Sequence, residues 1–168
     1  MQNIRKRIAL LILGFTAASV IGWLCEEICV YLVYGSFYKR GLLHLTLCPI
    51  YGFGACGIWL LLRRVQSTAV FLVSSAAIAG IFEYVCSIWL ERVFHRSFWD
   101  YKGWLFSFQD RVSLLSCIWF SLLALVFVRA VLPLLRGCIR RGNDRVFLAG
   151  SLCIAAVILG DFLLTVFR

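Results

Sequence analysis

The chain has 168 residues and a formal net charge of +9, with 62% hydrophobic and 15% charged residues. Soluble domains average about 45–50% apolar and about 25% charged residues, so most of this apolar excess must face lipid. The composition excludes a soluble enzyme, a nucleic-acid-binding protein and a disordered regulator. The basic residues stand in short runs between apolar stretches, which is the pattern that orients a membrane protein.

The first apolar run follows three basic residues near the N-terminus, and it predicts a membrane helix over residues 8–34. The apolar region of a signal peptide is shorter, about 7–15 residues, and ends at a small-residue cleavage site. This run can span roughly 30 Å of hydrocarbon even when tilted. We therefore expect it to remain in the mature protein.

Two further helices are predicted after a polar stretch over residues 35–47, which leaves open whether that stretch re-enters the bilayer. Pro49 suits the first turn of a helix over 49–62, because its missing N–H is harmless there. This helix is short for a membrane span, so a tilt or local thinning of the bilayer is expected. The third helix is predicted over 67–90, where Ala76 and Gly80 would let helix backbones approach closely.

The second half of the chain alternates between apolar helices and polar or aromatic segments. Residues 91–110 form an aromatic-rich loop, which favours the membrane–water interface. Helices are predicted over 111–135 and 146–167, and the basic segment 136–145 between them is interpreted as a contact for anionic lipid. The predicted fold is an all-α, polytopic integral membrane helix bundle of about five transmembrane helices, forming a single domain over 1–168.

Five spans would place the two termini on opposite sides of the membrane. Basic residues number nine on the N-terminal side against seven on the other. Because positive loops tend to stay inside, we expect a multi-pass protein of the plasma membrane with a cytoplasmic N-terminus and an extracytoplasmic C-terminus.

Neither a metal site nor a cofactor is predicted. The eight cysteines form no CxxC pair, and only His44 and His95 could complete a zinc site. Most of these cysteines lie in apolar runs, where a thiol behaves as a small hydrophobe. The sequence contains no GxxxxGK[ST] loop, so it does not itself bind ATP in the P-loop manner.

Ionisable residues inside membrane helices are costly and rare, so each one is a candidate functional residue. Glu83, Ser87 and Glu91 are spaced i, i+4, i+8 and share one helical face. Arg111, at the predicted start of the fourth helix, is expected to pair with a carboxylate of this face. The other candidates are Glu26, Glu27 and Asp161.

The alternation of spans predicts that several of these candidates gather on one side of the membrane. Glu26 lies late in the first helix and Tyr51 early in the second, while Glu83 and Glu91 lie late in the third. The predicted orientation makes this side extracytoplasmic. A structural interpretation stays open, in which such carboxylates only hold helices together, and we favour it for Glu27 and Asp161, which lie near helix ends.

Four ordered strings carry a family resemblance: GWLCE at 22–26, LCPIYGFG at 47–54, EYVCSIWLE at 83–91 and FWDY at 98–101. Together they resemble the ABC-transporter type IV membrane proteins, also called CmpB-like proteins, which are often labelled ABC transporter permeases. The resemblance runs from about Gly22 to Trp119. The sequence departs from the family pattern at Lys102, where the family tends to have Ser, and just before Arg111, where it tends to have Gly.

The resemblance implies that polar and aromatic residues of these strings are signature positions. We take the candidate substrate-binding residues to be Glu26, Tyr51, Glu83, Tyr84, Glu91, Asp100, Tyr101 and Arg111. No catalytic residue is predicted.

The favoured hypothesis is a permease-like subunit that moves a small polar or charged solute through a carboxylate-lined, outward-facing site. The bilayer and a separate ATP-binding subunit are its expected partners, and nucleic acid is not. Five short spans enclose little volume, so a homo-oligomer or another subunit is expected to complete the pathway. Two alternatives stay open: a membrane-embedded enzyme acting on a lipid headgroup, and a scaffold or assembly protein.

Overall fold

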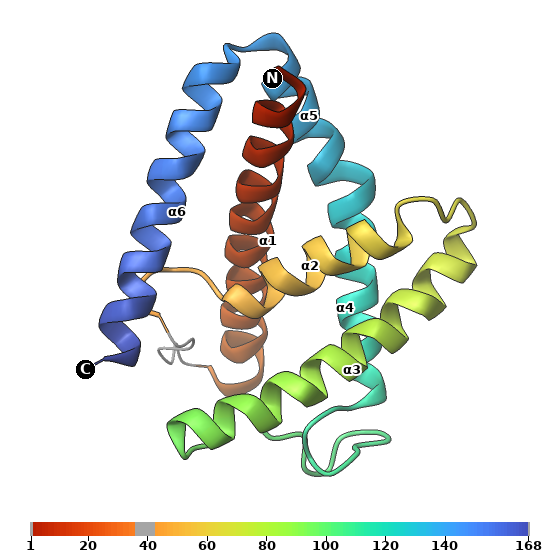
Figure 1. The fold of residues 1–168 in the computed structure, drawn as a ribbon. Helices are drawn as coiled ribbons and strands as arrows, with labels where there is room; N and C mark the ends of the chain where they lie inside the picture. The colour runs from red at the N-terminus through yellow and green to blue at the C-terminus, as the bar shows by residue number, and fades with distance from the viewer. Residues whose placement is uncertain (1, 36–42, 168) are drawn as a thin grey trace. The chain divides into compact units, whose positions relative to one another are not determined.

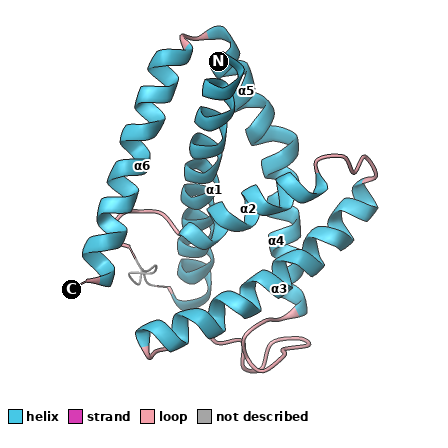
Figure 2. Ribbon diagram, viewed as in Figure 1, coloured by secondary structure: helices cyan, strands magenta, loops and turns pink. Residues whose placement is uncertain are grey.

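The computed structural model describes residues 2–35 and 43–167, and every regular element in this part of the chain is a helix (Figure 2). The predicted all-α class is therefore confirmed. The question of a re-entrant segment at 35–47 falls largely on residues 36–42, which lie outside the described residues. In chain order the helices are α1 (Gln2–Tyr34), α2 (Pro49–Leu62), α3 (Thr68–Phe94), α4 (Leu114–Val126), the π-helix η1 (Phe127–Val131), α5 (Leu132–Arg141) and α6 (Asp144–Val166) (Figure 1).

Among the described residues, four helical segments are long and apolar enough to cross a membrane, namely Ile4–Leu32, Thr68–Phe94, Leu114–Arg141 and Asp144–Val166. Helix α2 is shorter, with 14 residues, and at 1.5 Å per residue it reaches only about 21 Å of the roughly 30 Å hydrocarbon core. Large apolar side chains on these helices are exposed, Leu32 by 76% and Val73 by 72%. Such apolar surfaces are stable when they face lipid, as expected for a bundle of about five membrane helices.

Helix α2 has the predicted bounds, whereas α3 continues to Phe94 instead of ending at residue 90. Ser67 caps the start of α3 by accepting the backbone N–H of Val70. The helix ends where His95 adopts a left-handed conformation, with φ 52°, and donates its N–H to the Glu91 carbonyl across 2.8 Å. This backbone reversal has no strong sequence signal, because position 95 lacks the glycine that usually marks a helix end of this kind.

The predicted fourth helix, 111–135, starts later and continues further in the structure. It starts at Leu114 because Ser113 and Ser116 form a capping box, each side chain accepting the other's backbone N–H. Pro133 does not end it, since the π-helical turn of η1 directly before α5 relaxes the hydrogen-bond pattern that proline interrupts. Most of the basic segment 136–145 is therefore helical, in α5 up to Arg141 and in α6 from Asp144.

Internal contacts divide the chain into unit 1, Met1–Cys56 with Arg129–Arg168, and unit 2, Gly57–Val128. In unit 1, helix α1 packs against α5 and α6. Helices α1 and α6 run in the same direction, so the N- and C-termini lie at opposite ends of this unit (Figure 1). A single membrane domain over 1–168 stays a prediction.

Two glycines allow α1 and the first half of α2 to pack closely in unit 1. A Cβ atom on Gly22 would lie 2.1 Å from the Tyr51 ring, and one on Gly52 would lie 2.3 Å from Ser19 Oγ. The Cys48 N–H adds a hydrogen bond of 3.0 Å to the Ser19 carbonyl. Because these contacts leave no room for larger side chains, they fix Tyr51 against α1.

In unit 2, α3 packs along α4. The core contains Ile58, Phe71, Ala79 and Ala124, each no more than 6% exposed. Gly80 marks the close approach of the two helices, since a Cβ atom there would lie 2.8 Å from Cys117 Sγ. The buried residues of α3 recur every four positions from Phe71 onward. Glu83 and Ser87 continue this series, so they lie on the same face as Phe71 and Ala79.

Candidate functional site

The Glu83 side chain joins three elements of unit 2. It is 3% exposed. Its Oε1 accepts the hydroxyl of Tyr101 across 2.5 Å, and its Oε2 accepts the hydroxyl of Ser116 across 2.8 Å. Tyr101 belongs to the loop between α3 and α4, and Ser116 to the first turn of α4. Burying a polar group costs little free energy only when the group is hydrogen-bonded. The two hydroxyl donors therefore stabilise Glu83 at its buried position.

Arg111 extends the polar cluster along the same face of α3. Its Nη1 donates to Ser87 Oγ across 2.9 Å, and its Nη2 forms an ion pair with Glu91 Oε2. The predicted pairing of Arg111 with a carboxylate of α3 is thus confirmed. Arg111 lies three residues before α4 and does not start it. The two side chains of the ion pair are 26% and 44% exposed, so the pair is more open than Glu83.

The loop over residues 95–113 is tightly folded, which fixes the positions of Tyr101 and Arg111. The Tyr101 N–H donates to the Asp110 carbonyl across 2.9 Å, and the indole N–H of Trp99 donates to the Arg111 carbonyl across 3.0 Å. Phe106, Gln109 and Asp110 have φ between 51° and 56°. Left-handed conformations are uncommon for such residues, so the tight path of this loop is held by its contacts.

The structure brings five of the eight candidate residues together in unit 2: Glu83, Tyr84, Glu91, Tyr101 and Arg111. Tyr84 joins at the edge of this group, where its hydroxyl donates to Gln109 Oε1 across 2.8 Å. Asp100 is exposed and accepts the Lys102 N–H across 2.8 Å, so its carboxylate stabilises a local turn.

The remaining two candidates, Glu26 and Tyr51, interact with each other in unit 1. The Tyr51 hydroxyl donates to Glu26 Oε1 across 3.0 Å. Their predicted gathering with the carboxylates of α3 on one side of the membrane stays a prediction, because Glu83 and Glu91 belong to unit 2.

Sequence reasoning missed Ser116, which supplies one of the two hydroxyl bonds to Glu83. Its hydroxyl oxygen also accepts the Ser113 N–H across 3.1 Å and lies 2.9 Å from the Ser113 carbonyl. The available signal was the pair of serines three positions apart at the start of an apolar run, which is the spacing of a capping box. The bond to Glu83 itself could not be found this way.

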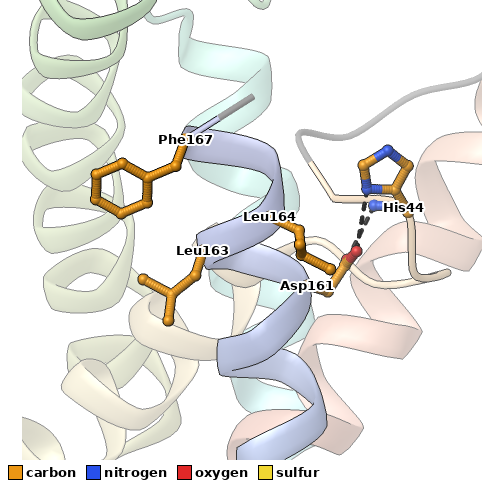
Figure 3. Close-up of a pocket in the computed structure, with 5 residues that line it drawn as sticks. All are labelled: His44, Asp161, Leu163, Leu164 and Phe167. Carbon is orange, nitrogen blue, oxygen red and sulfur yellow. Dashed lines mark hydrogen bonds and ion pairs between the residues drawn. The ribbon is translucent and has the colours of Figure 1, made fainter.

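A second polar contact in unit 1 involves Asp161, close to the end of α6 (Figure 3). Its Oδ1 lies 3.0 Å from His44 Nδ1, and its Oδ2 accepts the backbone N–H groups of His44 and Leu45 across 2.9 and 3.0 Å. A pocket of about 830 Å³ borders this pair and is also lined by Leu163, Leu164 and Phe167. The contacts agree with the structural interpretation of Asp161, since they attach residues 44 and 45 to α6.

Cys48 lies just before α2 and is partly buried. Burial, followed by the nearby Glu26 carboxylate, raises the pKa of the Cys48 thiol to about 12. The thiol therefore stays protonated over the physiological range and has little nucleophilic character.

Comparison with known families identifies a match over most of the chain. Residues 13–166, nearly the whole chain, match the family described as "Putative ABC-transporter type IV". The resemblance carried by residues 22–119 is thereby confirmed and extended toward both termini. No curated protein and no solved structure matches the chain.

Proposed function

Because the chain belongs to the ABC-transporter type IV family, we propose that it is a permease-type membrane subunit that moves a small polar or charged solute. Its long apolar helices make it a multi-pass membrane protein. Its sequence contains no P-loop, so a separate chain would hydrolyse ATP. We further propose that it resides in the plasma membrane with its N-terminus in the cytoplasm.

The observation that carries this proposal is the buried Glu83 carboxylate and its two hydroxyl donors. A carboxylate inside a membrane helix costs free energy and is therefore rare. Where one occurs, it commonly marks a solute or ion pathway. Here its hydrogen bonds come from Tyr101 and Ser116, on two elements other than α3. A proton or small cation arriving at Glu83 would therefore alter the contacts of α3, the loop and α4 together.

The Arg111–Glu91 ion pair would form the outer part of this site. It lies two helical turns beyond Glu83 on the same face of α3 and is more exposed. A charged pair at this position can orient a polar solute by exchanging hydrogen bonds with it. Within unit 1, Glu26 and Tyr51 form a separate carboxylate–hydroxyl pair. A second copy of the chain or another subunit would complete the pathway.

The first test is purification of the full chain in mild detergent, followed by mass spectrometry of the proteins that co-purify. A stoichiometric ATP-binding protein is expected, and solute uptake into liposomes holding the complex would then be compared for wild type and Glu83→Gln. Glu27→Gln is the matched control, because Glu27 is a carboxylate of unit 1, whereas Glu83 and its partners belong to unit 2. Purification of the chain alone, with no uptake by any preparation, would contradict the permease role.

A second candidate function is an enzyme acting on a lipid headgroup, and one observation favours it. The loop that carries Tyr101 exposes Trp104, Leu105 and Phe106 by 48%, 65% and 76%. Such side chains suit the headgroup level of a bilayer, and the same loop carries Arg111 and reaches Glu83 through Tyr101. The cellular lipid profile separates the two functions: a change in Glu83→Gln cells without a change in solute uptake would favour the enzyme.

A further inference from the structure

Two basic segments far apart in the sequence lie at one end of unit 1. The first is at residues 5–7 in the first turns of α1, and the second is at residues 136–145 around the α5–α6 connection. Figure 1 shows the start of α1 beside the end of α5 and the start of α6, and α1 packs against both of these helices. We call this group the basic end; its cationic members are Arg5, Lys6, Arg7, Arg136, Arg140, Arg141 and Arg145.

The charge of the basic end is strongly one-sided. Within the two segments that define it, Asp144 is the one acidic residue against seven basic residues. Arg7, Arg140, Arg141 and Arg145 have exposed side chains.

The turn between α5 and α6 holds the arginines of both helices close together. Only Gly142 and Asn143 separate the helices, and the Asn143 side chain accepts the Arg145 N–H across 2.9 Å. A Cβ atom on Gly142 would lie 2.3 Å from the Phe147 ring. This packing makes the turn compact, so little ordering is needed when the arginines bind a ligand.

Apolar side chains border the basic end on all three helices. Ile4 on α1 is 61% exposed, Leu134 on α5 is 70% exposed and Val146 on α6 is 66% exposed. The opposite face of α5 is buried within unit 1, where Leu132 and Ile139 are 1% and 2% exposed. A ligand that covers this surface must therefore offer anionic groups beside apolar chains.

We propose that the basic end binds anionic phospholipids, with phosphate groups on the arginines and acyl chains along the apolar border. Arginine suits this role because its planar guanidinium donates two parallel hydrogen bonds to a phosphate. A soluble phosphate compound would leave the apolar border uncovered, and an acidic protein surface would not supply flexible apolar chains. The site is independent of the Glu83 cluster and of the predicted orientation.

The test uses the full chain purified in detergent that contains phosphatidylcholine. Phosphatidylglycerol is then titrated in, and native mass spectrometry counts the lipid molecules that the protein retains. Each basic residue near anionic lipid contributes about fivefold to the binding affinity. The double variant R140Q/R141Q is therefore expected to weaken phosphatidylglycerol retention about 30-fold. The matched control is R63Q/R64Q, an adjacent arginine pair in unit 2, which should retain the lipid as wild type does. Neither the wild type nor either double variant should retain phosphatidylcholine.

Three outcomes would overturn the proposal. The first is that wild type retains phosphatidylglycerol and phosphatidylcholine equally. The second is that both double variants lose phosphatidylglycerol to the same extent. The third is that an acidic protein co-purifies with wild type but not with R140Q/R141Q, while lipid retention is unchanged. If R140Q/R141Q does not fold, R7Q/R145Q removes two other exposed charges of the basic end and must show the same lipid-selective loss.

Discussion

Tyr101 donates its hydroxyl to Glu83 across 2.5 Å, and this bond joins the α3–α4 loop to the buried face of α3. The two residues are 18 positions apart. The bond exists because the loop doubles back on itself, with the Tyr101 N–H on the Asp110 carbonyl. Tyr101 thus contacts the buried face of α3, while Trp104, Leu105 and Phe106 of the same loop stay exposed.

We expect Tyr101→Phe to lower the free energy of unfolding by about 1–3 kcal/mol, because it removes a donor from a buried carboxylate. Thermal unfolding of the purified protein in one detergent measures the loss. Tyr84→Phe is the control, since the Tyr84–Gln109 bond is exposed and its removal should cost less than about 1 kcal/mol. Equal effects of the two substitutions would show that the Tyr101 bond does not stabilise the fold.

Breaking the Arg111–Glu91 ion pair should have a small effect on stability. Both side chains are partly exposed, and exposed pairs contribute about 0–1 kcal/mol. A double-mutant cycle of Arg111→Gln and Glu91→Gln is expected to give a coupling energy of at most about 1 kcal/mol. A coupling above about 2 kcal/mol would mean that the pair is buried in the membrane-embedded protein.

Gly52→Ala should destabilise unit 1. The added Cβ would lie 2.3 Å from Ser19 Oγ and 2.6 Å from the Phe15 ring, and overpacking of this kind costs about 1–3 kcal/mol. Gly57→Ala on the same helix is the matched control, because no atom lies within 4 Å of its added Cβ. Helix propensity alone favours alanine at both positions by about 1 kcal/mol. The prediction is wrong if both variants unfold at the same temperature.

Cys48 should resist thiol-directed reagents. With its pKa raised to about 12, its thiolate fraction at pH 8 is about one in ten thousand, and labelling should become appreciable only as the pH approaches 12. The raised pKa also makes a contribution to stability that is complete below about pH 9 and is lost as the pH rises toward 12.

Peptide mapping after maleimide labelling at pH 8 tests the low reactivity of Cys48. Cys138, on the exposed face of α5 beside the basic end, is the internal comparison and should be modified first. Modification of Cys48 at the same rate as Cys138 would show that the thiol is not buried.

The sequence by itself determined the features that depend on local pattern. Long apolar runs predicted the membrane helices, and Pro49 predicted the start of α2, because this signal acts within one helical turn. The i, i+4 spacing placed Glu83 and Ser87 on one face, which the structure buries. The charge of Arg111 led to the expectation of a carboxylate partner, and the partner is Glu91.

Only the tertiary structure decided which distant groups meet. Ser116 bonds to Glu83 from 33 positions away, and His44 contacts Asp161 from 117 positions away. Residues 5–7 and 136–145 share one end of unit 1 for the same reason. The contacts of Glu83 follow from the path of a loop with left-handed residues and from the packing of α3 on α4 around Gly80. Neither leaves a periodic trace in the sequence, because hydrogen bonding and steric fit depend on atoms brought together from separate segments.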